Sequence, residues 1–415
     1  MERIMNILKM SKLRTFCFAL LILFPVCAFA FDWGLLTDQN FSVEKAGDAD
    51  EALSYSAAFI PWFSSPLFEG DGDIYLSVGA TAKYENEKWQ FVPELHQFDF
   101  SFVFDTGEIR AGRMRYADPL GFTASGLFDG LSLAVDAGSG SFSAGMWYTG
   151  FLYKKTANIT VTSADFDSYN AEFTFDNFSD TYFASKRILA AVGWEHPALG
   201  ERVRLRVSLL NQGDVNGGDS WYHSQYLIAR ASIPVTPRFV LDAGGSLSVA
   251  ESRVEAKENV GVSLAGQLEA GVFLPTSIQD KLSFRGTFSS GKTEDGNIEA
   301  YVPLTTVSQG GVLGAKLSGL SVLCLDYTAR LHRTFSAALS NSYFVLSDKG
   351  TYKDWPAATG AEGFFLGTEV YGQLIWSPVA DLRLNLGGGV FIPGDAAPNE
   401  KLKWKLELAA QLAIF

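Results

Sequence analysis

The chain has 415 residues, a formal net charge of −13 and only three cysteines, so a disulfide-rich scaffold is excluded and nucleic acid is a disfavoured partner. It carries 33 phenylalanines, 15 tyrosines, 9 tryptophans and 40 glycines against 14 prolines. Many aromatic residues together with many glycines favour strands and turns over helix bundles. The composition therefore predicts one repetitive all-β architecture.

The first thirty residues resemble a secretory signal peptide. Four basic residues lead into FCFALLILFPVCAFA, which ends on the small-x-small pattern of Ala28 to Ala30. A short anchor helix is less favoured because the apolar run holds only about 15 residues and contains Pro25. A lipidated Cys27 lacks the small residue expected just before it. Cleavage after Ala30 would remove four basic residues and one acidic residue, taking the net charge from −13 to −16, and would leave Cys324 without a disulfide partner.

Residues 31–50 show no assignable pattern, whereas 51–415 are predicted to form a single transmembrane β-barrel domain. In DIYLSVGATAKYE (73–85) and ERVRLRVSL (201–209), apolar residues alternate with polar ones, as in strands with one apolar face. Counting such segments from 51–62 to 401–415 gives about eighteen strands, if 88–95 and 97–104 are separate. Sixteen is the alternative count, if two weak segments merge.

Two classes of connection separate these segments. Short ones look like tight turns: 85–88, 105–108, 137–140, 198–201, 235–238, 277–280 and 379–381. Longer polar stretches alternate with them: 63–72, 117–126, 154–180, 211–219, 292–300, 336–362 and 394–400. Short periplasmic turns and long extracellular loops are typical of outer-membrane barrels. On this assignment the strand 51–62 runs outward, with Trp62 near the outer rim and Trp89 near the inner rim.

The chain ends in KLKWKLELAAQLAIF, with seven apolar residues on the even positions from Leu402 to Ile414 and lysines opposite them. An open sheet of this size would expose two long edges, and closure into a barrel removes them. A β-propeller or β-helix is the rival fold, but neither accounts for the two classes of connection. The last strand is also expected to engage the barrel-assembly machinery.

These features together resemble Gram-negative-type outer-membrane porins. The stretch IRAGRMRYADPLGFTASGLFDGL (109–131) is similar to one in large barrels of the alginate-export type, where a Gly-Arg strand end is followed by a loop and an F-D-G-L strand. The chain departs from the usual terminal signal at Phe415, which falls on the polar parity of Lys403 and Gln411. The resemblance implies an outer-membrane location.

A barrel of 16 to 18 strands has room for a water-filled lumen, so a porin-like channel for small hydrophilic solutes is the expected function. Basic residues on the polar faces could guide an anion by bidentate contacts, but the favoured interpretation is that they solvate the wall and pair with opposite charges across it. Residues 154–180 are the best candidate for a constriction inside the lumen, and an outer flap is equally expected for them. The pore-lining candidates are Arg113, Arg115, Arg202, Arg204, Arg206, Arg285, Arg383, Lys401, Lys403, Asp99, Glu269 and Glu369.

Two other functions stay open: an adhesin or receptor that acts through its long loops, and an outer-membrane hydrolase. The hydrolase is disfavoured because the adjacent His223 and Ser224 would point to opposite faces of a strand. We therefore predict no enzyme activity, no catalytic residue, no cofactor and no metal site, although EGDGD (69–73) could hold a divalent cation. Membrane lipid and small solutes are the expected partners, and the sequence leaves the oligomeric state open.

Overall fold

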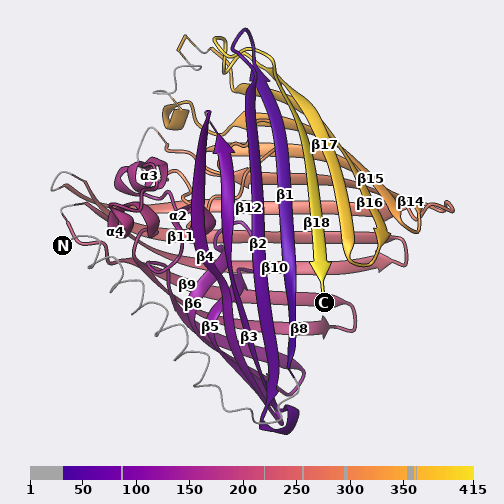
Figure 1. Ribbon diagram of the computed structural model, residues 1–415. Helices are drawn as coiled ribbons and strands as arrows, with labels where there is room; N and C mark the ends of the chain where they lie inside the picture. Colours follow the sequence, from indigo (N-terminus) through magenta and orange to yellow (C-terminus); the bar gives the residue numbers. More distant parts are fainter. Residues whose placement is uncertain are drawn as a thin grey trace, which may run out of the picture.

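The computed structural model describes residues 31–85, 87–218, 220–254, 257–293, 298–352, 359–360 and 362–415. Eighteen antiparallel strands, each paired to the next along the chain, close into a barrel because the first strand pairs with the last (Figure 1). The predicted closed all-β barrel and its strand count are confirmed, and the count of sixteen is wrong. The proposed signal peptide lies outside the described residues.

The strands are long and the helices short. The strands are β1 (Asp32–Ala46), β2 (Ala52–Leu67), β3 (Gly72–Glu85), β4 (Lys88–Phe104), β5 (Gly107–Ala117), β6 (Ser125–Ala137), β7 (Gly140–Tyr148), β8 (Arg187–Leu199), β9 (Val203–Asp214), β10 (Trp221–Thr236), β11 (Phe239–Val254), β12 (Lys257–Phe273), β13 (Lys281–Ser289), β14 (Leu320–His332), β15 (Phe335–Leu346), β16 (Phe365–Val379), β17 (Leu382–Pro393) and β18 (Lys403–Ile414). The helical turns are η1 (Phe68–Gly70), α2 (Lys154–Ala157), α3 (Ser163–Asn170), α4 (Phe178–Tyr182) and η2 (Gly350–Tyr352). Within the described ranges, no helix is long and apolar enough to cross a membrane.

Two errors of the sequence analysis cancel in the strand count. Residues 32–46, inside the unassigned segment, form β1, so the barrel begins at Asp32 and not at residue 51. The two strands expected at 88–95 and 97–104 are one strand, β4, whose pairing with β3 shifts register at Ser77 and Val78. Because one strand was missed and one was counted twice, the total stayed at eighteen.

The same two errors reverse the direction of the first strands. The predicted outward strand 51–62 lies in β2, which runs from the end of the barrel that carries the long loops to the end that carries the short turns. The connection at 68–71 therefore joins the short turns, and the one around residue 87 joins the long loops. Trp62 and Trp89 exchange rims accordingly. From the turn at 105–106 onward, each predicted turn lies at the end of the barrel that the sequence analysis gave it.

Two loops also differ from their predicted lengths. The segment 336–362 contains most of β15, so that loop shortens to 347–364. The polar stretch expected at 292–300 extends over 290–319. Residues 149–186 and 290–319 are therefore the two longest connections, and both lie at the same end of the barrel.

Closure of the barrel depends on a small residue in β1. A Cβ on Gly34 would lie 2.4 Å from the carbonyl oxygen of Ile414 and 2.7 Å from Nε1 of Trp62. The Trp62 ring in turn contacts the terminal Phe415, with ring centroids 5.8 Å apart. Phe415 thus packs against Trp62. It lies on the same face of the strand as Lys403 and Gln411, as the sequence alternation predicted.

We expect Gly34→Val to weaken closure between β1 and β18, at a cost of about 1–3 kcal/mol, because the clash involves backbone as well as a ring. Closure can be measured in detergent gels as the fraction of unheated protein that migrates as a compact band. Gly286→Val is the matched control, since the nearest atom to its Cβ would be a leucine methyl 3.4 Å away. Equal folded fractions for the two variants would contradict the prediction.

Candidate functional site: the barrel lumen and its inward-folded loops

The two faces of the wall differ in exposure and chemistry. In β8, Ile188 and Val192 are 43% and 59% exposed, whereas Leu189 between them is fully buried. β12 shows the same alternation, with Leu264 and Leu268 exposed. Since exposed large apolar residues recur on this parity around the barrel, the outer face suits lipid and the opposite parity faces the lumen.

The long loops fold into the lumen and bury apolar side chains there. Leu152 and Ile159 of the 149–186 loop and Tyr301 and Leu304 of the 290–319 loop are at most 3% exposed. They form one cluster with inward residues of β5 to β10, such as Leu189. The 149–186 loop therefore narrows the lumen, which favours the constriction over the outer flap for 154–180, and the 290–319 loop joins it.

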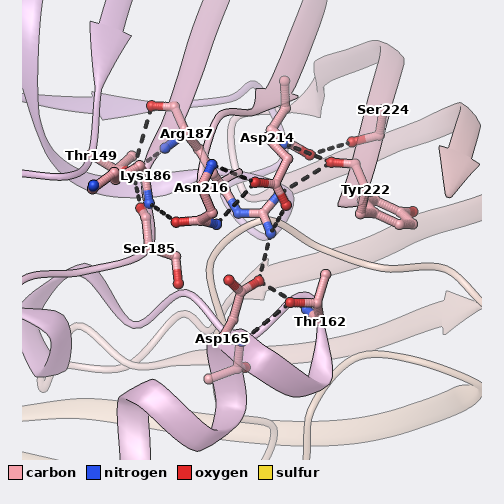
Figure 2. A network of polar contacts seen from close by, with 12 residues as sticks. Thr149, Thr162, Asp165, Ser185, Lys186, Arg187, Asp214, Asn216, Tyr222 and Ser224 are labelled. Carbon is pink, nitrogen blue, oxygen red and sulfur yellow. Dashed lines mark hydrogen bonds and ion pairs between the residues drawn. The ribbon is translucent and has the colours of Figure 1, made fainter. Parts of the chain in front are cut away.

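A buried arginine fixes the 149–186 loop to the wall (Figure 2). Nη2 of Arg187 donates to Oδ2 of Asp165 at 2.5 Å and to Oδ2 of Asp214 at 3.1 Å, while Nη1 donates to the Tyr222 carbonyl oxygen at 3.2 Å. Arg187 is fully buried and Asp165 is 2% exposed. Asp165 belongs to α3, where it also completes a capping box with Thr162. A loop carboxylate and a wall arginine thus form one buried ionic contact.

The charge of Asp165 is maintained by its surroundings. Burial alone would raise the pKa of this carboxyl, but Arg187 and hydrogen bonds from Ser185 and Thr162 hold the pKa below its usual value. Lys316 of the other loop donates from Nζ to the Thr160 carbonyl oxygen at 2.7 Å. Burial lowers the pKa of Lys316 to about 8, with Asp165 opposing and Arg187 reinforcing that shift.

The depressed pKa of Lys316 predicts a pH dependence of the loop contact. Protonating a buried lysine is costlier in the docked loop than in the released loop, whose pKa lies near 10.5, so docking should strengthen as the pH rises from about 8 to about 10.5. The gain is no more than about 3 kcal/mol. Fewer opening fluctuations in single-channel records at pH 10 than at pH 7 would show it. Lys316→Met should abolish the difference, and a wild-type record independent of pH would refute it.

Glu369 of β16 fixes the 290–319 loop. Its Oε1 accepts a hydrogen bond from the N–H of Gly311 at 2.6 Å, and its Oε2 accepts from Val312 at 3.0 Å and Leu313 at 2.8 Å. Glu369 is 2% exposed. Successive backbone N–H groups around one carboxylate form an anion nest. This candidate therefore anchors a loop.

The two loops also bind each other and the short loop 118–124. Asn158 donates from Nδ2 to the Thr306 carbonyl oxygen at 2.6 Å, and Thr306 returns a backbone bond to Asn158 at 3.0 Å. The Tyr301 hydroxyl lies 2.7 Å from Oγ1 of Thr123. Three connections far apart in the sequence thus pack as one unit inside the barrel.

Eight of the twelve pore-lining candidates lie on the inward parity of their strands. A belt across β8 to β14 combines arginines with acids: Arg204 bonds Glu195, and Arg285 lies 3.3 Å from Asp326. Glu269 accepts from Lys281 at 3.0 Å. The inward candidates are Asp99, Arg204, Arg206, Glu269, Arg285, Glu369, Arg383 and Lys403.

The other four candidates lie elsewhere. Arg113 is 4% exposed and is held within the wall by Asp129, so its assignment to the open pore is wrong. Arg115 lies exposed near the long-loop end of β5. Arg202 and Lys401 lie in connections, and Lys401 bonds Asp48.

Two cavities lie along this charged belt. One of about 400 Å³ is lined by Arg230, Glu269, Arg285 and Gln309, among others. Another of about 350 Å³ is lined by Lys281, Asp326 and Tyr371. Charged groups of both signs face these spaces, which suits the passage of small polar solutes.

Sequence reasoning missed several functional side chains. Arg187 begins a strand, and Asp165 lies in a polar stretch with no regular pattern, so only their contact reveals their role. Arg230 and Asp242, which pair across β10 and β11 at 3.1 Å, do follow the strand alternation. Both would have been found by taking every charged residue at the inward-facing positions of each predicted strand.

The hydrogen bonds of His223 and Ser224 bear on whether these two residues could act together in a hydrolase. Nδ1 of His223 accepts a hydrogen bond from the Asp214 backbone at 3.0 Å, whereas the Ser224 hydroxyl bonds Gln212 and Tyr226. This serine and histidine therefore form no nucleophile–base pair. Among the residues described, no three His, Cys, Asp or Glu side chains converge as a metal site would require.

The architecture is that of an outer-membrane porin. No family model matches the chain, and no curated protein sequence does either. Solved structures do: OpdK from Pseudomonas aeruginosa has a TM-score of 0.60 at 14% identity over 92% of this chain and 99% of that one. OccK5 (OpdH) of the same organism gives 0.60 at 11% identity, covering 93% and 98%. OccK2 (OpdF) in complex with glucuronate gives 0.58 at 11%, covering 92% and 96%.

These similarities show that the chain has the fold of OprD and Occ porins. They also test the resemblance inferred from the sequence. The predicted porin fold is confirmed. The comparison with alginate-export barrels is not confirmed, since the similar structures named here are of the OprD and Occ type.

Proposed function

We propose that the protein is an outer-membrane channel that takes up small hydrophilic solutes through a narrowed, charge-lined lumen. The observation that carries this proposal is the inward belt of charged residues beside cavities of about 350 and 400 Å³, the second of which is lined in part by the inward-folded 290–319 loop. Such a lumen is narrower than an open barrel of eighteen strands would leave. The proposal is supported by the fold shared with OccK2, which was solved in complex with glucuronate.

We further propose that the channel prefers anions. Most arginines of the belt have an acid partner, which supports the alternative that they solvate and pair along the wall. Arg206 differs, because no carboxylate of the described residues lies within ion-pair distance of it. It pairs directly with Arg230 across the ladder and lies two residues from Arg204 on the same face. This locally positive stretch is the element suited to carboxylate or phosphate groups.

Planar-bilayer recordings under a salt gradient test both parts. We expect discrete conductance steps and a reversal potential of anion-selective sign. Arg206→Gln should move the reversal potential toward that of an unselective pore, because it removes a cation whose cross-strand neighbour Glu195 is bonded to Arg204 instead. Arg238→Gln, the same change in an exposed turn, is the control. Absence of steps would refute the channel, and equal potentials for wild type and Arg206→Gln would refute the role of Arg206.

The adhesin alternative requires loops that present their side chains outward. Here the 149–186 loop buries Leu152 and Ile159, and Asp165 is bound to the wall. These residues serve the lumen, so the loop geometry favours the channel.

A further inference from the structure

The wall has a seam in the half of β4 that lies nearer the long loops. β4 pairs with β3 from Lys88 to Phe102, but with β5 only from Phe98 to Phe104. Residues 88–97 therefore have a strand neighbour on one edge only. An unpaired edge within a membrane needs other partners for its backbone groups.

The comparable overhang in β12 is closed differently. β13 pairs with β12 only from Ala265 to Phe273, but Ile298 forms a parallel bridge to Val262 beyond it, and the Glu299 N–H donates to the Val262 carbonyl oxygen at 2.9 Å. Across the free edge of β4, the described residues form no backbone-to-backbone bond of this kind. The β4 seam is therefore a distinct feature of this barrel.

Side chains cover the β4 edge instead. The Tyr182 hydroxyl in α4 donates to the Pro93 carbonyl oxygen at 2.8 Å, and proline itself has no N–H to satisfy. Nη1 of Arg113 donates to the Leu95 carbonyl oxygen at 2.5 Å. The same guanidinium binds both oxygens of Asp129 at 2.8 and 2.9 Å and the Phe151 carbonyl oxygen at 3.0 Å. One arginine thus bridges β4, β6 and the loop.

The seam lies at the level of the outer half of the apolar band. Trp89, on the outer face, groups with Tyr55 and Tyr84 at ring-centroid distances of 6.2 and 5.3 Å, as in an interfacial aromatic girdle. Phe91, the next outward residue, is 55% exposed. Pro93 follows two residues further from the rim, so the free edge faces lipid chains.

A cavity of about 610 Å³ lies directly behind this edge. Its lining includes Gln90, Val92, Glu94, Tyr153 and Phe173, so it offers polar groups and aromatic rings together. Glu94 is 7% exposed; its carboxyl has a side-chain hydrogen bond with Thr156, and its Oε1 has no hydrogen-bond partner. A buried acceptor without a donor is costly unless a ligand supplies one.

The charges of the cavity balance. Three lysines and three glutamates line it: Lys83, Lys88, Lys155, Glu85, Glu94 and Glu172. A neutral head group rich in hydroxyls matches such a lining better than an ion does, because it both donates and accepts hydrogen bonds.

We propose that the seam between β4 and β5 is a lateral portal through which a single-chain amphiphile with a neutral, hydroxyl-rich head passes between the outer leaflet and this cavity. The head would donate to Glu94, and the tail would extend past Pro93 into lipid. Arg113 and Tyr182 form the removable closure, since both bind the edge through side chains alone. This route is additional to conduction along the barrel axis.

The test uses octyl glucoside in two photoreactive forms, one with a diazirine on the sugar and one with a diazirine at the end of the chain, each added to full-length protein in lipid vesicles below the solubilising concentration. After illumination, mass spectrometry should find adducts of the sugar-labelled form on cavity residues such as Val92 and Phe173, and adducts of the chain-labelled form on lipid-facing residues such as Leu131. Cross-linking Pro93→Cys to Tyr182→Cys with a bismaleimide, in a Cys324→Ser background, should reduce the cavity adducts to background. The Leu131 adducts should remain.

A matched lock controls for the cross-linker. Ile109→Cys and Leu133→Cys, directly opposite in the intact ladder of β5 and β6, should leave the cavity adducts unchanged when joined. Arg113→Met should raise them, with gel mobility before heating showing that the barrel is intact. Cavity adducts that survive the seam lock would mean entry through the mouth and overturn the portal. Labelling confined to the lipid face would overturn it as well.

Discussion

Arg187→Met is expected to release the 149–186 loop from the lumen. The substitution leaves the carboxylates of Asp165 and Asp214 buried without their shared cation, and breaking a buried ion pair in this way costs about 3–5 kcal/mol. Lys154, which is 2% exposed in the docked loop, should then become a rapid site of trypsin cleavage. Single-channel conductance should rise at the same time.

Two further variants separate charge from packing. Arg204→Met breaks an exposed pair with Glu195 and should cost less than about 1 kcal/mol, so its loop should stay protected. The triple variant Arg187→Met, Asp165→Asn, Asp214→Asn removes the stranded charges and should recover part of the protection. Full resistance to trypsin in Arg187→Met would show that apolar packing alone holds the loop.

The wall was largely predictable because alternation is a local signal, and the failures have physical causes. In β1 the outward parity carries Thr37 and Gln39 between Trp33 and Phe41, so its apolar face is interrupted. In β4 the register shift changes which parity faces outward, from that of Phe91 to that of Phe98. A bulge of this kind makes one strand look like two.

The loops were less predictable because their contacts join distant segments. Glu369 has the inward parity of a pore-lining acid, and nothing near it in the chain indicates that Gly311 to Leu313 will surround it. Arg113 shows the reverse, since its partners Asp129 and Phe151 lie on other elements and remove it from the pore. Strand parity places a residue on a face, but only tertiary contacts decide whether its charge stays available to solutes.

Glu369→Gln is expected to release the 290–319 loop. A carboxylate accepts on both oxygens, whereas an amide accepts on one, so the variant must present an N–H₂ group either to Gly311 or to Val312 and Leu313. Losing a hydrogen bond to a charged acceptor costs about 1.5–3 kcal/mol, which shifts the released fraction roughly ten- to hundredfold. Single-channel records should show frequent transitions to a larger conductance, and trypsin should cleave faster after Lys316.

The control must change the same charge without touching the loop. Glu407 faces the lumen from β18 and binds Lys405 and Tyr371, so Glu407→Gln removes one inward charge and leaves the nest intact. Single-channel records of Glu407→Gln should show one conductance level, as in the wild type. If Glu369→Ala behaves like Glu369→Gln, the carboxylate geometry decides docking, since a partly functional amide would give an intermediate. Unchanged records in both Glu369 variants would assign docking of this loop to Tyr301 and its neighbours.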